Sequence, residues 1–352
     1  MKLNKINSFA VSYTNKCNIE CRHCIVDCGP DKGEKLDFER FLLFVGRFKE
    51  FGVKSLEVTG GESFLFFDEL VKIFSEAKKL GVSSSLISNG LWGFSEENAE
   101  RVVSELVGAG LKGLYISSDE FHLEFVPAKS VFNIVDAVMK RKEKVKAVIK
   151  FCYSRNYSFF DFLTENAGYF KNLKKKYPKK NLNVLVQPVI PLGRAIEKVP
   201  KENCVAGKKT TEKLCPMLGS PFINHDGNVF FCCNGSELSN PLEGVFFLGN
   251  FYSDSFEEFV KKYQKNLFAF YVKVKGPAFI EKLVRKHKLK KVNKMKYPLV
   301  GYTGICDFCF WNLGQYLKQD LDDMLLEEFS KDKAMQKLAV KESLKFRKNK
   351  KN

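Results

Sequence analysis

Hydrophobic and polar positions follow two different periods along the first 190 residues. Short runs rich in β-branched residues predict six strands, at residues 8–13, 55–60, 84–89, 111–117, 146–153 and 183–189. Between several of them, apolar residues recur at spacings of three and four, which predicts helices over 37–51, 67–81, 95–110 and 130–144. Asp37 and Ser95 are placed to cap helix starts, and Gly81 and Gly110 are placed to end helices.

This alternation predicts an α/β protein built from six βα units with a parallel sheet. Because each crossover is right-handed, the helices lie outside a sheet that forms either an open barrel or a doubly wound sheet. The periodicity alone does not choose between these two.

The pattern changes after Pro191, where Gly, Pro and Cys interrupt the apolar runs. Only short strands are predicted there, around 221–232. Residues 255–291 read as helical, 302–309 as a loop and 312–346 as helical again. We therefore expect a second, smaller module.

The cysteine content points to metal or redox chemistry. No secretory signal is expected at the N-terminus, and no run approaches the roughly 18 apolar residues of a membrane span, so a cytoplasmic protein without a membrane span is predicted. Eleven cysteines among 352 residues are hard to explain as disulfides in that compartment, which keeps thiols reduced.

The positive charge gathers at the end of the chain. Residues 261–352 hold 23 Lys and Arg against 9 Asp and Glu, and the segment from Lys282 to Lys296 has eight basic residues and no acid. Such a segment can attract an acidic peptide or nucleic acid, or it can be an ordinary solvated surface. We do not expect nucleic acid, because no nucleic-acid-binding motif accompanies the charge.

Three cysteines stand at CxxxCxxC spacing directly after the first predicted strand: Cys17, Cys21 and Cys24. Three thiolates on one short loop can ligate three irons of a 4Fe-4S cluster and leave the fourth iron open. A zinc site or a chance group of buried thiols are the alternatives. Cys28 follows at the wrong spacing to complete the set.

The motif CNIECRHC resembles the signature of the radical S-adenosylmethionine (radical SAM) superfamily. That resemblance implies a partial six-unit barrel and S-adenosylmethionine as a cofactor. TGGES (59–63), LISNG (86–90) and ISSDEFH (116–122) close predicted strands where the superfamily binds this cofactor. The residues implied as contacts are Gly60, Gly61, Glu62, Ser88, Asn89, Ser117 and Asp119. A simple turn or loop-capping role is the alternative for each.

A second cysteine group lies in the C-terminal module. Cys215, Gly227 and Cys232 form a CxnGx4C pattern, and Cys306 and Cys309 form a CxxC pair. Four thiolates suit either a closed 4Fe-4S cluster or a zinc ribbon. The hairpin resembles Twitch or shortened SPASM domains, which implies one auxiliary 4Fe-4S cluster. The expected division is a partial barrel at 1–200, an auxiliary-cluster domain with a helical insertion at 201–315, and a C-terminal helix with a basic tail at 316–352.

Cys233 directly follows a predicted ligand. Neighbouring residues of an extended segment point to opposite sides, so Cys233 is expected to face away from the cluster when Cys232 faces it. A spare buried thiol, or an exchange of roles with Cys232, are the alternatives.

Five segments together resemble radical peptide epimerases of ribosomally synthesised peptides: CNIECRHCIVDCGP, TGGESFLFFDEL, LISNGLWGFS, ISSDEFHLEFVP and HDGNVFFCC. The resemblance implies conversion of L-residues to D-residues, with a 5′-deoxyadenosyl radical removing the Cα hydrogen and Cys233 returning a hydrogen atom. It also implies a precursor peptide as substrate and an electron donor such as flavodoxin or ferredoxin. A maturase that crosslinks its peptide, or an iron–sulfur or zinc protein that binds nucleic acid without turnover, are the competing hypotheses.

Overall fold

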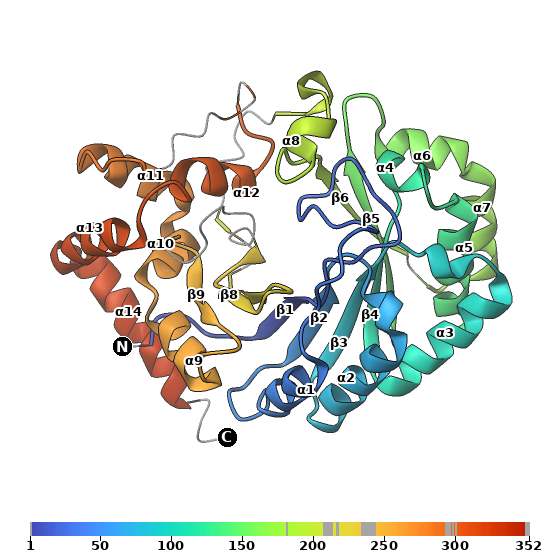
Figure 1. Cartoon of the computed structure of the whole chain (residues 1–352), viewed down its shortest axis with the longest axis horizontal. Helices are drawn as coiled ribbons and strands as arrows, with labels where there is room; N and C mark the ends of the chain where they lie inside the picture. Colours follow the sequence, from blue (N-terminus) through green and yellow to red (C-terminus); the bar gives the residue numbers. More distant parts are fainter. Residues whose placement is uncertain are drawn as a thin grey trace. The chain divides into compact units, whose positions relative to one another are not determined.

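The computed structural model describes residues 2–180, 182–206, 214–215, 218–233, 244–292, 297, 299 and 301–348 (Figure 1). The chain divides into two compact units. The barrel unit comprises residues 11–50 and 54–205, and the C-terminal unit comprises residues 1–10, 51–53 and 206–352. The three-part division expected above stays a prediction.

The predicted strands lie in the order β6-β5-β4-β3-β2-β1, and the barrel unit contains all of them except the first three residues of β1. Their bounds are Ser8–Ser12 (β1), Ser55–Thr59 (β2), Ser83–Ser88 (β3), Leu111–Ser117 (β4), Lys146–Tyr153 (β5) and Asn183–Pro188 (β6). Neighbouring strands from β2 to β6 pair in parallel, so their carboxyl ends meet at one edge. The predicted α/β fold with a partial barrel is confirmed.

The predicted helices are present but shorter, and the last begins two residues before its predicted start: α1 (Phe38–Gly46), α2 (Phe67–Lys79), α3 (Glu96–Ala109) and α5 (Ala128–Lys140). Asp37 and Ser95 cap α1 and α3 by accepting hydrogen bonds from the backbone N–H groups of Arg40 and Asn98. Gly110 ends α3 at φ +117°, a conformation that favours glycine. Figure 1 shows these helices outside the sheet.

Among the described residues of this unit, four further α-helices were not predicted: α4 (Glu120–Leu123), α6 (Phe159–Glu165), α7 (Ala167–Lys176) and α8 (Ala195–Lys198). Three of them are too short to show a helical period, because four to seven residues make at most two turns. The fourth, α7, carries five polar residues among its ten, which weakens its apolar stripe.

The strands present different residues to their two faces. In β4 Leu114 and Ile116 are fully buried, whereas Tyr115 and Ser117 are half-buried. In β5 Ile149 is likewise fully buried, and its neighbour Lys150 is half-buried. The apolar face forms the core, which leaves polar side chains on the opposite face of the sheet.

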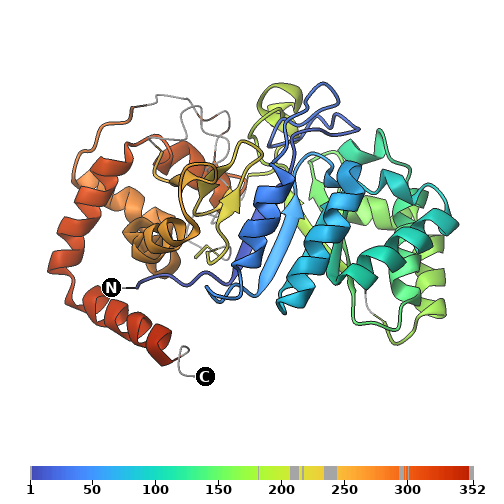
Figure 2. The same cartoon turned by 60° about the horizontal axis from the view of Figure 1, so that its bottom comes forward.

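In the C-terminal unit, β7 (Phe222–Ile223), β8 (Asn228–Phe230) and β9 (Phe247–Asn250) pair in antiparallel order. Its helices are α9 (Phe256–Lys265), α10 (Leu267–Lys275), α11 (Pro277–Lys286), α12 (Ile305–Phe308), α13 (Lys318–Lys331) and α14 (Lys333–Lys348). Figure 2 shows α13 and α14, in red, joined at a bend. The short strands predicted around 221–232 and the helical stretches are confirmed.

The loop predicted at 302–309 is wrong in its second half. Residues Ile305–Phe308 form the helical turn α12, and Cys309–Leu313 continue it as a π-helix. The cause is local: the buried carboxylate of Asp307 accepts hydrogen bonds from the backbone N–H groups of Thr303 (2.8 Å) and Gly304 (2.8 Å), which caps the turn.

Candidate functional site

The three-cysteine loop follows β1 and is closed by its own backbone. The N–H of Cys17 donates to the carbonyl of Gly29 (3.0 Å), and that of Cys24 donates to the carbonyl of Cys21 (3.2 Å). Cys17 and Cys21 are buried, and Cys24 is half-buried. The loop therefore holds its three thiols on a compact segment of the barrel unit.

The thiols of this loop sit in different electrostatic surroundings. Burial raises the pKa of Cys17 to about 12, and the nearby Cys21 and Cys24 add to that effect. A hydrogen bond with the Cys28 thiol lowers the pKa of Cys24 to about 6 against the opposing effect of burial. Crowding thiols this closely makes their common ionisation costly without a cation among them.

The backbone of Gly60 and Gly61 lies in close contact with the start of the cysteine loop. The N–H of Gly61 donates to the carbonyl of Thr14 (2.7 Å), and that of Glu62 donates to the carbonyl of Lys16 (2.8 Å). A Cβ at Gly61 would lie 2.1 Å from the Lys16 carbonyl oxygen, and one at Gly60 would lie 2.5 Å from that of Thr14. Only glycine permits this backbone approach.

Glu62 joins the ends of β2 and β3. Its carboxylate accepts hydrogen bonds from the backbone N–H of Asn89 (2.7 Å) and from the Ser88 hydroxyl (3.1 Å). The Asn89 amide nitrogen donates to the Asn18 side chain (2.7 Å) and lies 3.9 Å from the Cys17 sulfur. Burial raises the pKa of Glu62 to about 7. The structure thus brings the predicted Glu62, Ser88 and Asn89 together beside the cysteine loop.

Asp119 caps α4 by accepting hydrogen bonds from the N–H groups of Phe121 and His122. It also holds two imidazoles: His122 Nδ1 lies 2.8 Å from one oxygen, and His23 Nε2 lies 3.7 Å from the other. The Cys152 N–H donates to Asp119 as well (3.2 Å). Loop capping is therefore at least part of the role of Asp119. Ser117 ends β4 and is half-buried.

Sequence reasoning missed His122, Cys152 and Arg194. His122 follows Asp119 by one helical turn, and Cys152 lies near the end of β5, so the rule that sites form at the carboxyl ends of parallel strands could have found both. Arg194 carries no such signal, because its contacts with residues 20–28 span more than 160 positions.

Five cysteines line one apolar hollow of the C-terminal unit: Cys215, Cys232, Cys233, Cys306 and Cys309. The rest of its wall is apolar: Phe231, Phe246, Phe268, Val272 and Ile305. Burial raises the pKa of Cys306 to about 12, and Cys233 and Cys215 add to that effect. The hollow thus gathers the four predicted ligands and Cys233, one thiol more than a 4Fe-4S cluster needs.

The donor sets of both units fit iron–sulfur clusters. The barrel unit offers three thiols on a loop that Gly61, in the turn after β2, contacts closely. The C-terminal unit offers four or five thiols around a hollow. Zinc stays an alternative in the barrel unit, since donor atoms of Cys21, His23 and His122 lie within 4.8 Å of one another.

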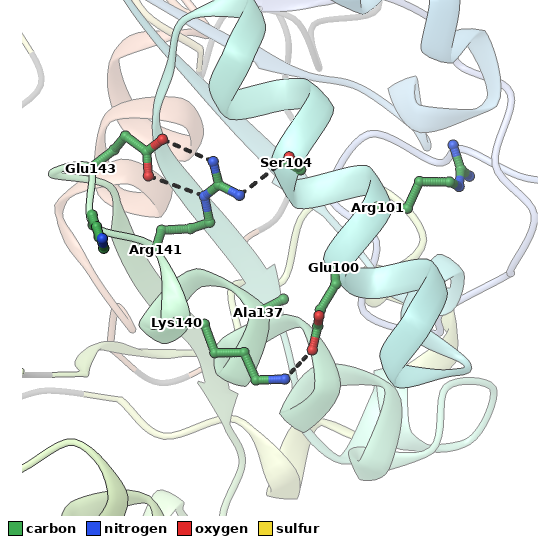
Figure 3. Close-up of a pocket in the computed structure, with 8 residues that line it drawn as sticks. Glu100, Arg101, Ser104, Ala137, Lys140, Arg141 and Glu143 are labelled. Atoms are coloured by element: carbon green, nitrogen blue, oxygen red, sulfur yellow. Dashed lines mark hydrogen bonds and ion pairs between the residues drawn. The ribbon is translucent and has the colours of Figure 1, made fainter.

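Charged side chains line a surface pocket between α3 and α5, and several of them pair with one another (Figure 3). Arg141 donates to both oxygens of Glu143 (2.8 and 3.1 Å) and to the Ser104 hydroxyl (3.2 Å). Lys140 pairs with Glu100. These contacts form two separate ion pairs, and we assign these residues no role in the reaction.

Some basic side chains of the segment from Lys282 to Lys296 form ion pairs with glutamates. Lys286 and His287 contact Glu328 (2.7 and 2.8 Å), and Arg285 pairs with Glu281. The predicted absence of acid from 282 to 296 is correct for the sequence, but carboxylates from outside that range pair with it: Glu328 of α13 and Glu281 of α11. Residues 293–296 and the last four residues lie outside the described part of the chain.

Comparison of the sequence with known proteins finds one family model and several relatives. A sequence model of the radical SAM superfamily matches residues 11–162. The chain is 23% identical over 312 residues to YydG of Bacillus subtilis (strain 168), whose name assigns it provisionally to peptide biosynthesis. That alignment covers 86% of this chain and 91% of YydG.

Solved structures show remote likeness. The structure of tagged anSMEcpe with bound AdoMet is 14% identical, with a TM-score of 0.46 over 91% of this chain and 99% of that one. Streptococcus suis SuiB bound to precursor peptide SuiA is 11% identical, with a TM-score of 0.45 over 87% of this chain and 76% of that one. Among the described residues, no helix is long and apolar enough to cross a membrane.

Proposed function

Since residues 11–162 match the radical SAM superfamily, we propose that this chain is a radical SAM enzyme that converts L-residues to D-residues in a ribosomally synthesised precursor peptide. The similarity to YydG, a protein named for peptide biosynthesis, supports a peptide substrate. The epimerase assignment goes further than that similarity and depends on one cysteine.

The observation that carries the proposal is the exposure of Cys233. All eleven cysteines are described, and Cys233 alone is exposed, whereas its neighbour Cys232 and the other three thiols of the hollow are half-buried or buried. A cluster ligand needs shielding from water, but a hydrogen donor has to reach a peptide backbone. We therefore assign Cys215, Cys232, Cys306 and Cys309 to an auxiliary 4Fe-4S cluster and Cys233 to hydrogen return.

A Cα–H bond of an unactivated peptide is too strong for acid–base chemistry, so a cofactor has to supply the radical. When bound, the barrel cluster with S-adenosylmethionine would supply a 5′-deoxyadenosyl radical that removes the Cα hydrogen. Cys17, Cys21 and Cys24 would hold that cluster, and the Gly60–Gly61–Glu62 turn with Ser88, Asn89, Ser117 and Asp119 would hold S-adenosylmethionine.

The hydrogen return balances in atoms and electrons. The Cys233 S–H bond breaks, its hydrogen atom forms the new Cα–H bond on the opposite face, and the sulfur is left as a thiyl radical. One electron and one proton then restore the thiol. The electron comes from an external donor such as flavodoxin or ferredoxin, and a neighbouring auxiliary cluster offers a route for it.

Crosslinking of the peptide is the second candidate. It is favoured by the position of Cys233 in the same hollow as Cys306 and Cys215, which suits a fourth ligand as well as a donor. In that case the peptide radical is captured by another group of the peptide, and no exposed thiol is needed.

The deciding experiment is the mass of the product peptide formed in deuterated water. Epimerisation through an exchangeable thiol adds about one mass unit per site, whereas forming a crosslink removes about two. Reduced enzyme that does not convert S-adenosylmethionine to 5′-deoxyadenosine would contradict both candidates and favour a binding protein without turnover.

A further inference from the structure

Arg194 folds back from the end of β6 onto the three-cysteine loop. Its Nη1 donates to the carbonyl of Cys21 (3.0 Å), its Nη2 donates to the carbonyl of Cys28 (2.7 Å), and its backbone N–H donates to the carbonyl of Cys24 (3.0 Å). One residue thus binds three carbonyls of a loop that lies more than 160 positions earlier in the sequence. Both segments belong to the barrel unit.

Two carboxylates complete the surroundings of this guanidinium. Asp27 lies 2.9 Å from Nη2, and Glu20 lies 3.7 Å from it. The Arg194 side chain is only 9% exposed, whereas these two carboxylates are more than half exposed. A rigid, planar fork of donors suits several fixed acceptors at once, which a flexible lysine cannot reproduce.

Gly193 makes the approach possible. Its backbone adopts φ +54°, and a Cβ there would lie 2.4 Å from the Ile25 carbonyl oxygen and 2.7 Å from that of Cys24. A side chain at this position would therefore push the whole segment away from the loop. Pro191, two residues earlier, restricts the backbone that leads into this contact.

We propose that Arg194 is a positioning residue that holds the three-cysteine loop in its cluster-binding conformation before a cluster is present. Its donors bind the carbonyls of Cys21 and Cys28 and its backbone binds that of Cys24, so the loop cannot open without breaking all three contacts. Its charge also places a fixed cation next to the loop. The proposal rests on the cluster role of the loop within the proposed function, but not on epimerisation.

The first test measures hydrogen–deuterium exchange of the full-length chain before iron and sulfide are added. In Arg194→Met, the amides of Cys17 and Cys24 should exchange at least about tenfold faster than in the wild type, because the loop loses two charge-assisted hydrogen bonds. Arg194→Lys should give an intermediate rate. The matched control is Arg141→Met, which removes another arginine with a bidentate carboxylate partner from the same unit (Figure 3).

The second test distinguishes an effect of Arg194 on the barrel cluster from a purely structural role in the fold. After anaerobic reconstitution, Arg194→Met should lose the electron paramagnetic resonance signal of the barrel cluster or lower its midpoint potential, since reduction adds negative charge where a cation was removed. Arg194→Lys, which keeps the charge, should stay close to the wild-type potential. The auxiliary cluster should keep its signal in both variants.

Wild-type exchange at Cys17 and Cys24 in Arg194→Met would overturn the proposal, as would the same acceleration in Arg141→Met. If Arg194→Met does not fold, Arg194→Lys and Gly193→Ala replace it, and wild-type exchange in both would again overturn it. If only the proposed function is wrong, Arg194→Met still changes amide exchange in the three-cysteine loop, but the product peptide of the wild type contains no D-residue.

Discussion

The carboxylate of Glu62, at the end of β2, accepts a hydrogen bond from the backbone N–H of Asn89, at the end of β3, over 2.7 Å. Asn89 in turn lies 3.9 Å from the Cys17 sulfur. The turn after β2 is thereby connected both to the next strand and to the cysteine loop. A buried carboxylate at this junction makes the stability of the barrel unit depend on pH.

The first prediction concerns that dependence. The pKa of Glu62 is about 7 in the folded chain against 4.5 ordinarily, so between these pH values the folded state holds a proton that the unfolded chain has released. Raising the pH from 5 to 7.5 should therefore weaken the folded state of the cluster-free protein by about 2 kcal/mol. Urea unfolding at pH 5 and pH 7.5 measures it. Glu62→Gln should lose this share of the pH dependence, and an unchanged difference between the two pH values would contradict it.

The second prediction concerns Gly61. Alanine there places its Cβ 2.1 Å from the Lys16 carbonyl oxygen, so the turn has to move away from the cysteine loop. We expect Gly61→Ala to cost about 2 kcal/mol of folding free energy and to abolish S-adenosylmethionine binding. Gly108→Ala is the control, because its Cβ in α3 meets nothing within 4 Å, and it should stabilise the protein by about 0.5–1 kcal/mol. Wild-type affinity for S-adenosylmethionine in Gly61→Ala would contradict the role of this turn.

Much of the barrel could be predicted because its signals are local. The bounds of β4 and β5 match the prediction, since β-branched and aromatic runs end at clear breaks in both. Asp37 and Gly110 act as predicted because a cap depends only on residues within one turn of it.

The candidate site could be predicted only in part. Glu62, Ser88 and Asn89 follow their strands directly, so their meeting at one edge of a parallel sheet follows from topology. The approach of Arg194 to Cys21 and Cys28 depends instead on the path of the chain after β6, which no local pattern encodes. The pairing of Lys286 with Glu328 could not be predicted from the sequence for the same reason.

The third prediction counts iron. Anaerobically reconstituted protein should hold about eight irons per chain in two 4Fe-4S clusters. Joint replacement of Cys17, Cys21 and Cys24 by Ala should leave about four and abolish cleavage of S-adenosylmethionine, since the auxiliary thiols belong to the other unit. Iron analysis and electron paramagnetic resonance measure both. Eight irons in the triple variant, or tightly bound zinc in place of iron, would exclude the two-cluster assignment.

The fourth prediction concerns the basic segment that starts at Lys282. Because Arg285 and Lys286 are paired with carboxylates, recruitment of an acidic precursor peptide should depend on the exposed Lys282, Lys288 and Lys290. Reversing these three charges to Glu should weaken peptide binding about tenfold at low salt and much less at high salt. Fluorescence anisotropy with a labelled peptide measures it.

The control for that prediction reverses the same number of charges elsewhere. Lys171, Lys174 and Lys175 are exposed on α7 of the barrel unit, and Lys→Glu changes there give an equal change in net charge. Equal weakening by both sets would mean that only net charge matters. No weakening by the first set would mean that the segment is a solvated surface without a role in recruitment.

The last prediction compares two thiols, because the structure offers a rival to Cys233 as hydrogen donor. Cys152 is half-buried near the end of β5, where its N–H donates to Asp119, and Gln187 Nε2 lies 3.3 Å from its sulfur. Burial raises the pKa of Cys152 to about 12, so it stays a thiol at neutral pH and retains the hydrogen atom that a donor needs. It therefore serves as a matched control for the removal of a thiol.

We expect Cys233→Ala to keep about eight irons and to form 5′-deoxyadenosine at close to the wild-type rate, because neither cluster assembly nor Cα abstraction uses this thiol. D-residues should nevertheless fall below about 1% of the wild-type amount, since the stranded peptide radical has no donor on the opposite face. Cys152→Ala should retain D-residue formation. Chiral amino-acid analysis of the product, with iron content measured in parallel, separates the outcomes. If Cys233→Ala loses about four irons, Cys233 is a ligand of the auxiliary cluster; if instead Cys152→Ala alone abolishes D-residues, the donor lies in the barrel unit and the assignment of Cys233 is wrong.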